Sequence, residues 1–374
     1  KDPKRLDAAL VVSDGPDTVA CGMFTKNVFC AAPVQVDREL LAYHMPRAVL
    51  LNSGNANAAT GEPGLAIARK AAQAAAHALG LPEGEALVAS TGVIGVDLPW
   101  TPFETGIPAL VEALSRDGGH DAACAIMTTD THPKEHAVRF VYDGNEYAVG
   151  GMVKGSGMIQ PDMATMLAVI TTDMPIAPDD ARLALQSAVN VSFNKVTVDS
   201  DTSTNDSVFF FSSGVGAPVA DADEAAAVLA EALRVVCEDL ARQIAADGEG
   251  ATKLVTVFVR DAKDVADADK AARTIANSPL VKTAIAGHDC NWGRIAAALG
   301  RSGASFEQHD VDMGMPVLRA GLPCGFDEDE ALRRFEDDEI VIEVSLGTGG
   351  GADTRVWTCD LTHEYIHINA DYRS

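Results

Sequence analysis

The sequence predicts an α+β fold whose strands and helices form layers, and three observations support this prediction. Strand-like and helix-like segments mix along the chain without the strict alternation that a doubly wound parallel sheet requires. The 374 residues are 47% hydrophobic, which is enough for a sizeable core and for more than one domain or one large layered unit. Asp143-Gly144-Asn145 stands between two apolar runs, which indicates an antiparallel hairpin.

Short apolar runs bounded by turn residues predict the strands in the first part of the chain. They cover residues 7–13, 18–24, 47–51, 86–89, 137–141 and 146–149. An alanine-rich run with apolar residues at helical spacing predicts a helix over residues 64–79, which ends at Gly80.

The second part of the chain continues the mixture. Strands are predicted over residues 166–171, 207–211, 255–260, 339–345, 354–359 and 365–368. Helices are predicted over residues 178–190, 224–246, 264–276 and 294–300, the last one capped by Asn291. The glycine-rich run at 347–351 is interpreted as a hairpin turn. No internal repeat or low-complexity linker marks a domain boundary.

Charge and cysteine content restrict the function classes. The formal net charge is −25 and the pI is near 4.6, so the surface repels phosphate backbones and anionic lipid, and we expect no nucleic-acid or membrane partner. The seven cysteines are odd in number and form no CxxC motif, which is typical of a reduced cytosol. No apolar run reaches the roughly 18 residues of a membrane span, and no signal-peptide pattern is seen, so we expect a cytoplasmic protein.

The stretch KGSGMIQPDMATMLAVITTD, residues 154–173, offers a nucleophile. A threonine hydroxyl is weak, but a free α-amine on the same residue can act as its base, because that amine has a pKa of about 7.7–8.0. Thr165 gains such an amine only if its bond to Ala164 is cut. The glycine-rich loop before it lets the backbone bend, and the strand after it would hold a new N-terminus. Taken alone, the stretch also fits a threonine that simply starts a strand.

Other stretches have both a chemical and a structural interpretation. In STGVIG, residues 90–95, the Thr91 hydroxyl and the backbone N–H groups of Gly92 and Gly95 could bind an oxyanion, or the segment is an ordinary strand-end turn. The hydroxyl-rich runs at 127–131 and 198–206 lack the spacing and final glutamate of a calcium loop, so we expect side-chain turns there.

His363-Glu364-Tyr365-Ile366-His367 matches the HExxH pattern of zinc proteases, which requires a helix. The surrounding sequence LTHEYIHI is rich in β-branched and aromatic residues, which predicts a strand. Residues four apart on a strand are about 13 Å apart, too far to bind one zinc ion. We therefore expect no metal site here.

Eight stretches together resemble the glutamate N-acetyltransferase family, also called ornithine acetyltransferases, which serves arginine biosynthesis. Each stretch alone is weak evidence, but they occur in the family's order over nearly the whole chain, and the set is highly specific. The stretches are NSGNANAATG, STGVIG, AIMTTDT, GGMVKGSGMIQPDMATML, DTSTND, DGEGATK, CNWGRIAAALGRSG and NADYRS.

The resemblance implies a layered α/β/β/α-type sandwich with a smaller C-terminal α/β subdomain, roughly residues 280–374. It implies a precursor that cuts itself between Ala164 and Thr165, into an α chain of residues 1–164 and a β chain of residues 165–374 that stay together. Thr165 then becomes the nucleophile that takes acetyl from N2-acetyl-L-ornithine and passes it to L-glutamate.

Further residue roles follow from the same resemblance. Thr91 and Gly92 match the family's oxyanion-hole pair. The resemblance implies no cofactor, although some members accept acetyl-CoA as a second donor, and it implies a dimer or a larger assembly of αβ pairs. Substrate contacts carry over to Thr128, Lys154, Thr165, Glu249, Asn369 and Ser374.

Two alternatives stay open from the sequence. An amidase or aminopeptidase with the same amine-activated threonine would pass the acyl group to water instead of to an amino acid. A non-catalytic binding protein with the same fold would not cut itself at all.

Overall fold

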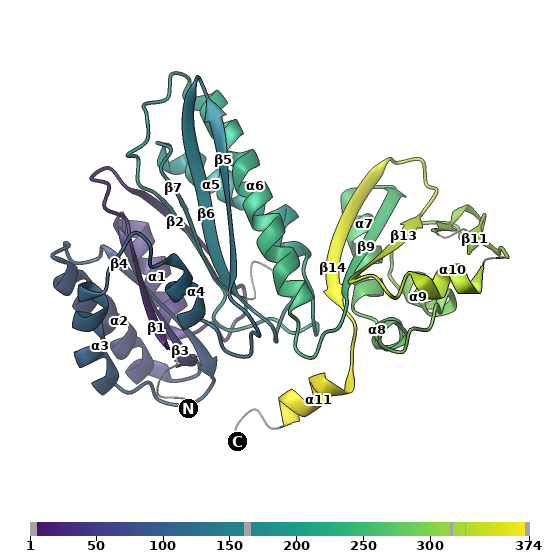
Figure 1. The fold of residues 1–374 in the computed structure, drawn as a ribbon, viewed down its shortest axis with the longest axis horizontal. Helices are drawn as coiled ribbons and strands as arrows, with labels where there is room; N and C mark the ends of the chain where they lie inside the picture. The colour runs from purple at the N-terminus through teal and green to yellow at the C-terminus, as the bar shows by residue number, and fades with distance from the viewer. Residues whose placement is uncertain (1–5, 161–165, 315–316, 326, 371–374) are drawn as a thin grey trace. The chain divides into compact units, whose positions relative to one another are not determined.

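The computed structural model describes residues 6–160, 166–314, 317–325 and 327–370. Contacts divide the chain into two compact units, each described by itself (Figure 1). The first unit comprises Lys1–Asn194 and Thr202–Ala241, and the second comprises Lys195–Asp201 and Arg242–Ser374. Ala164 and Thr165, the predicted cleavage residues, lie outside the described residues.

The first unit contains a five-stranded sheet in the order β2-β8-β7-β6-β5. Strands β7 and β8 are parallel, whereas the other neighbours are antiparallel. The sequence SVFFFS of β8 is buried throughout because layers cover both faces of this strand. The strands are β2 (Val19–Phe24), β5 (Lys134–Tyr142), β6 (Asn145–Lys154), β7 (Leu167–Thr172) and β8 (Ser207–Ser212).

A second sheet of the first unit has the order β1-β3-β4. Its strands are β1 (Ala8–Val12), β3 (Ala48–Asn55) and β4 (Ala86–Val93), and β3 and β4 are parallel. Helix α2 (Gly61–Leu79) makes the crossover between these two strands, and Gly80 ends it in a left-handed conformation, as the sequence predicts.

Helices cover the outer face of each sheet of the first unit, whereas α4 (Gly119–Ala125) adds Ala123 and Ala125 to the core between the sheets. Apolar side chains of α2 and of α3 (Thr101–Glu112) pack on the outer face of the three-stranded sheet. Leu51 and Leu87 of its inner face share a core with Leu167 and Phe209 of the five-stranded sheet. Helix α6 runs along the five-stranded sheet (Figure 1). The predicted α/β/β/α layering is therefore confirmed. The remaining helices are α1 (Ala32–Tyr43), α3 (Thr101–Glu112), α4 (Gly119–Ala125), α5 (Pro178–Val191) and α6 (Ala222–Ala246), with the 3-10 turn η1 (Phe193–Lys195).

The second unit is built on one mixed sheet in the order β12-β11-β10-β13-β9-β14. Its helices α7, α8 and α9 share an apolar core with β9, β13 and β14. The strands are β9 (Leu254–Ala262), β10 (Asp312–Met313), β11 (Leu318–Arg319), β12 (Leu322–Pro323), β13 (Glu339–Ser345) and β14 (Ala352–Cys359). The helices are α7 (Val265–Ala276), α8 (Pro279–Ala286), α9 (Trp292–Gly300), α10 (Glu328–Arg333) and α11 (His363–Ala370), with the 3-10 turn η2 (Gln308–Asp310).

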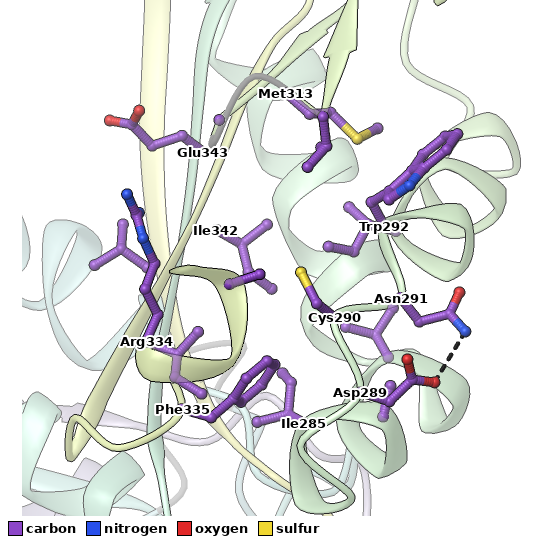
Figure 2. Close-up of a pocket in the computed structure, with 18 of the residues that line it drawn as sticks. Ile285, Asp289, Cys290, Asn291, Trp292, Met313, Arg334, Phe335, Ile342 and Glu343 are labelled. Carbon is purple, nitrogen blue, oxygen red and sulfur yellow. Dashed lines mark hydrogen bonds between the residues drawn. The ribbon is translucent and has the colours of Figure 1, made fainter. Parts of the chain in front are cut away.

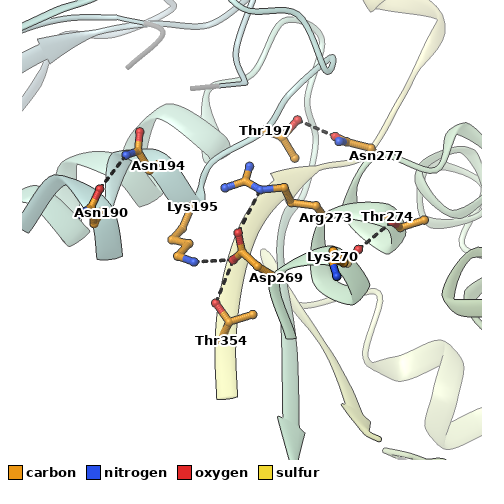
Figure 3. A network of polar contacts seen from close by, with 10 residues as sticks. All are labelled: Asn190, Asn194, Lys195, Thr197, Asp269, Lys270, Arg273, Thr274, Asn277 and Thr354. Atoms are coloured by element: carbon orange, nitrogen blue, oxygen red, sulfur yellow. Dashed lines mark hydrogen bonds and ion pairs between the residues drawn. The ribbon is translucent and has the colours of Figure 1, made fainter. Parts of the chain in front are cut away.

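A polar network explains why the short segment 195–201 belongs to the second unit (Figure 3). The Asp269 carboxylate on α7 accepts hydrogen bonds from Lys195, from Arg273 Nε at 3.3 Å and from Thr354 Oγ1 at 3.3 Å. Thr197 Oγ1 donates to the Asn277 side chain at 2.6 Å. Charge-assisted hydrogen bonds of this kind tie the segment to α7.

Three helices that the sequence prediction lacks have proline in their first turn. Pro33, Pro102 and Pro279 lie in the first turns of α1, α3 and α8. In that position the missing N–H of proline has no intrahelical partner to lose, so the residue starts a helix instead of breaking it.

Two local predictions are wrong. The glycine-rich run 347–351 is not a hairpin turn, because β13 and β14 both pair with β9 and the run crosses from one side of β9 to the other. Residues 363–370 form helix α11 instead of a strand. Thr362 Oγ1 accepts a hydrogen bond from the Glu364 N–H at 3.2 Å, and this cap starts the helix despite the β-prone sequence.

Candidate active site

The predicted oxyanion-hole pair lies at the carboxyl end of β4. The ladder with β3 sets Ser53 opposite Thr91 and Gly54 opposite Gly92. The φ angle of Gly92 is +132°, and a Cβ built there would lie 2.3 Å from the carbonyl carbon of Gly54. Only glycine fits this close approach of the two backbones, which lies beside the Thr91 hydroxyl.

Lys154, at the end of β6, joins this pair. Its Nζ donates a hydrogen bond to Thr91 Oγ1 over 3.3 Å, although the two residues are 63 positions apart in the sequence. Lys154 is only 8% exposed, so its ammonium is largely removed from solvent. Because the threonine oxygen accepts from the lysine, the hydroxyl proton of Thr91 is left to donate elsewhere.

A buried carboxylate holds this lysine. Lys154 Nζ lies 4.0 Å from Asp130 Oδ2, and Lys134 Nζ lies 2.7 Å from Asp130 Oδ1. The side chains of Asp130 and Lys134 are both fully buried. Burial alone would raise the pKa of Asp130, but the two lysine cations outweigh it and hold that pKa well below its usual range.

Backbone N–H groups complete the shell around Asp130. The Gly155 N–H donates to Oδ1 at 2.7 Å and the Thr128 N–H donates to Oδ2 at 3.0 Å. Asp130 therefore fixes the loop that carries Thr128 and the turn that follows Lys154. Four of the predicted site residues, Thr91, Gly92, Thr128 and Lys154, are brought together in the first unit.

The strand after the predicted nucleophile begins beside this cluster. Leu167 is the first residue of β7, and it pairs with Lys154 on one side and with Ser207 on the other. Met166 is described as well, and its carbonyl accepts from the Ser207 N–H at 2.9 Å. Ala164, Thr165 and Ser374 lie outside the described residues.

Two further predicted residues meet in the second unit. Asn369 Nδ2 donates to Glu249 Oε2 at 2.7 Å, and Glu249 is 7% exposed. The loop of Glu249 is fixed by Asp360, whose carboxylate accepts from the Thr252 N–H at 2.8 Å and from the Thr252 hydroxyl at 2.6 Å. The DGEG and NADYRS stretches, far apart in the sequence, thus share one hydrogen-bonded arrangement.

Comparison with known proteins decides the family. The whole chain, residues 1–374, matches the ArgJ family model. The arginine biosynthesis bifunctional protein ArgJ of Chlorobaculum tepidum is 48% identical over 377 aligned residues, which cover 100% of this chain and 93% of that protein. The chain belongs to the ArgJ family.

Other ArgJ proteins agree. The arginine biosynthesis bifunctional protein ArgJ of Symbiobacterium thermophilum is 47% identical over 375 residues, which cover 99% of this chain and 93% of that protein. The crystal structure of the ArgJ protein of Bacillus halodurans is 42% identical and matches with a TM-score of 0.53, covering 55% of this chain and 99% of that chain.

Membership of the ArgJ family confirms the resemblance seen in the sequence, the layered fold that it implied, and the acyltransferase activity in arginine biosynthesis. This ArgJ protein is an acetyltransferase, and the amidase alternative is not favoured.

Sequence reasoning missed the importance of Asp130 and Lys134 for this ArgJ protein. It gave Asp130 a turn role only and did not single out Lys134. A signal was present, because the period of two in β5 places Lys134 on the same face as Val138 and Phe140. A lysine on a buried face normally has an anionic partner, and Asp130 is the acidic residue four positions before Lys134.

The HExxH pattern of this ArgJ protein lies on helix α11, so the distance argument against a zinc site was wrong. Within the described ranges, no three His, Cys, Asp or Glu side chains come together to hold a metal ion. No helix in those ranges has both the length and the apolar character needed to cross a bilayer.

A cavity of about 410 Å3 lies elsewhere, inside the second unit of the ArgJ fold (Figure 2). Ile285, Trp292, Phe335 and Ile342 give it an apolar lining, and Cys290 lies at its wall. None of the candidate site residues that the structure describes lines it.

Proposed function

We propose that this ArgJ protein cuts itself between Ala164 and Thr165 and then carries acetyl from N2-acetyl-L-ornithine to L-glutamate on Thr165. The observation that supports this most directly is the hydrogen bond between Lys154 and Thr91, beside the strand that begins just after Thr165. It gathers oxyanion donors and a cation around the start of that strand.

Self-cleavage supplies the nucleophile. The Thr165 hydroxyl oxygen attacks the Ala164 carbonyl carbon, the peptide C–N bond breaks, and the chain becomes an ester with a free α-amine on Thr165. Water then hydrolyses the ester, which leaves a carboxylate on Ala164 and both a hydroxyl and an amine on Thr165. The amine is the base that the weak hydroxyl needs.

Acetyl transfer follows in two halves. The α-amine of Thr165 takes the hydroxyl proton while the oxygen attacks the acetyl carbon of acetylornithine, and the tetrahedral oxyanion is bound by the Thr91 hydroxyl and the Gly92 N–H. The C–N bond breaks, ornithine leaves with the proton, and acetyl stays on Thr165. The amine of glutamate then attacks the acetyl-threonine ester, which regenerates the hydroxyl and releases N-acetylglutamate.

Other residues position these groups. Lys154 directs the Thr91 oxygen by donating to it, so that the threonine proton faces the oxyanion, and the lysine charge strengthens that donor. Asp130 and Lys134 are positioning residues, because they hold Lys154 and the Thr128 loop. Thr128, Lys154, Thr165, Glu249, Asn369 and Ser374 are assigned to substrate binding on the family resemblance.

The relatives are named bifunctional, which supports a second donor. We assign that role to acetyl-CoA, whose thioester would acetylate Thr165 by the same attack. The reaction requires no resident cofactor. We further expect a cytoplasmic enzyme in which αβ pairs assemble into a dimer or a larger oligomer.

The test of the nucleophile uses two threonine variants. Thr165→Ala should remain a single chain on a denaturing gel and lose acetyl transfer. Thr171→Ala removes an exposed threonine of β7, six residues after Thr165 in the sequence, and should give the two fragments and normal transfer. A cleaved and active Thr165→Ala enzyme would overturn the assignment.

The test of the reaction uses acetylornithine with and without glutamate. Transfer predicts that ornithine release depends on glutamate and is matched by N-acetylglutamate formation. Release at the same rate without glutamate would indicate hydrolysis and refute the transferase mechanism. Replacing acetylornithine with acetyl-CoA measures the second activity in the same assay.

A further inference from the structure

A buried lysine and a buried cysteine touch in the second unit. Lys282, on α8, is 4% exposed, and Cys359, the last residue of β14, is 1% exposed. Lys282 Nζ lies 3.6 Å from Cys359 Sγ and 2.9 Å from Thr358 Oγ1. The two reactive atoms are therefore in contact within a closed, close-packed site.

The surroundings of this pair are unusual for a lysine. Among the described residues, no carboxylate oxygen lies within 4.0 Å of Lys282 Nζ, the distance limit for an ion pair. The hydrogen-bond partners of this nitrogen are instead a hydroxyl and a thiol. Buried lysines normally have an anionic partner. Nothing in the acetyl-transfer mechanism uses either residue.

We propose that Lys282 and Cys359 form a covalent nitrogen–sulfur crosslink when the protein meets hydrogen peroxide. The sulfur attacks one peroxide oxygen, the O–O bond breaks, and the products are a sulfenic acid on Cys359 and water. The lone pair of the Lys282 amine then attacks the sulfur, the S–O bond breaks, and the leaving hydroxide takes a proton as water. In sum, thiol, amine and peroxide give one S–N bond and two waters, with the sulfur oxidised by two electrons and the peroxide reduced.

Geometry favours this condensation over further oxidation. A sulfenic acid normally proceeds to sulfinic acid unless a nucleophile intercepts it, and here the amine is already in contact with the sulfur. Burial raises the pKa of the Cys359 thiol, with Lys282 acting in the opposite direction, so the first step is slow and the second is fast.

A matched internal control exists. Cys237 is also fully buried, and burial raises its pKa to about 12, but its hydrogen-bonding neighbour is Ser192 and not a lysine. Peroxide should therefore crosslink Cys359 and leave Cys237 uncrosslinked. A comparison of these two thiols separates the effect of the amine from the effect of burial.

Tryptic digestion gives the readout, because trypsin does not cut after a lysine whose side-chain nitrogen carries sulfur. In unmodified protein, digestion cuts after Lys282 and releases Cys359 in the peptide 356–373. In crosslinked protein, residues 274–294 stay uncut and bonded to that peptide. The linked species should be about 2 Da lighter than the summed masses of peptides 274–294 and 356–373, because two hydrogens leave.

The experiment treats the intact protein with hydrogen peroxide, blocks remaining thiols after denaturation, and digests it. A Cys290→Ser background removes the other cysteine of the lysine peptide, so that no disulfide can mimic the product. In this background, protein that retains Lys282 and Cys359 should give the linked species. Dithiothreitol should reduce the S–N bond and return both free peptides. Lys282→Met and Cys359→Ser should each abolish it, and the near-isosteric serine keeps the fold testable if the lysine variant unfolds.

Three outcomes would overturn the proposal. The first is that Cys359 is oxidised to sulfinic acid without being linked to Lys282. The second is that Cys359 stays unmodified under a peroxide treatment that oxidises the partly exposed Cys124. A linked species about 14 Da heavier than the two peptides would retain an oxygen and refute the condensation step as written.

The crosslink also bears on the active site, and this step rests on the proposed function. A Cβ built on Gly248 would lie 2.8 Å from Cys359 Sγ, and Glu249 is the next residue. We expect peroxide to slow wild-type acetyl transfer in proportion to the linked fraction, with recovery in dithiothreitol, and to slow Cys359→Ser less. Full activity of the linked protein would refute the effect of the crosslink on acetyl transfer. An untreated protein that shows no acetyl transfer would refute the proposed function and leave the crosslink itself untouched.

Discussion

Replacing Asp130 by asparagine tests the buried charge cluster in the first unit. The side chain keeps its shape, but the carboxylate charge disappears from between Lys134 and Lys154. The asparagine amide can accept at one oxygen only, whereas Asp130 accepts from Lys134, Gly155 and Thr128 through both oxygens. Two ammonium groups then face each other without their shared counter-ion.

The magnitude follows from burial. The side chains of Asp130 and Lys134 are both 0% exposed, so removing the carboxylate leaves the lysine charge away from water without its 2.7 Å ion-pair partner. Such a change costs about 3–5 kcal/mol. The matched control is Glu39→Gln, which breaks the Arg69–Glu39 pair whose side chains are 49% and 55% exposed, and it should cost no more than about 1 kcal/mol.

The assay is urea unfolding followed by fluorescence and circular dichroism, with acetyl transfer measured in parallel. The double variant Asp130→Asn with Lys134→Met should cost less than the sum of the two single changes, by about 1 kcal/mol or more. Transfer should also fall in Asp130→Asn, because Lys154 no longer holds Thr91 in place. Equal losses for Asp130→Asn and Glu39→Gln, or strict additivity in the double variant, would refute the reasoning.

Further predictions concern backbone, substrate contact and pH. Gly92→Ala should lower the free energy of unfolding by about 1–3 kcal/mol from the φ angle alone and reduce transfer about 100-fold or more. The control Gly106→Ala, in open space on α3, should raise the free energy of unfolding by about 0.5–1 kcal/mol. An active Gly92→Ala enzyme would argue against the oxyanion hole. Asn369→Ala removes the bond to Glu249 and should raise KM about 5–10-fold with kcat nearly kept, and an unchanged KM would remove Asn369 from substrate binding. The pKa of Asp130 is lowered by folding, so its contribution to stability is full above about pH 4 and is lost as pH falls below that value. The free energy of unfolding should therefore fall less steeply with acidification in Asp130→Asn than in the wild type. Parallel curves of unfolding free energy against pH would contradict this.

Much of the fold could be predicted because its elements carry local signals. The hairpin at Asp143-Gly144-Asn145 forms between β5 and β6 as expected, and Asn291 caps α9 by accepting from the Arg294 N–H at 3.2 Å. The strand predicted at residues 365–368 is a helix, because a cap at Thr362 and the Gly250 carbonyl that accepts from it decide the conformation. Propensity is a weak prior that tertiary contacts override.

The candidate site could be predicted in its residue types but not in its arrangement. The STGVIG residues suggested Thr91 and Gly92 as oxyanion donors and the family resemblance added Lys154, but no sequence pattern linked Lys154 to Thr91 across 63 positions. Asp130 and Lys134 were overlooked because a buried ion pair leaves only a faint trace in one sequence.

By itself, the sequence determined the family, the layered fold class and the types of side chain available for acetyl transfer, because these depend on local patterns and on motifs in a fixed order. The tertiary structure decided which charges are buried together, which threonine oxygen accepts the hydrogen bond from Lys154, and which thiol lies against an amine. Those properties depend on distances between strands and helices that are remote in the chain, and desolvation gives them their energy only after the layers have closed.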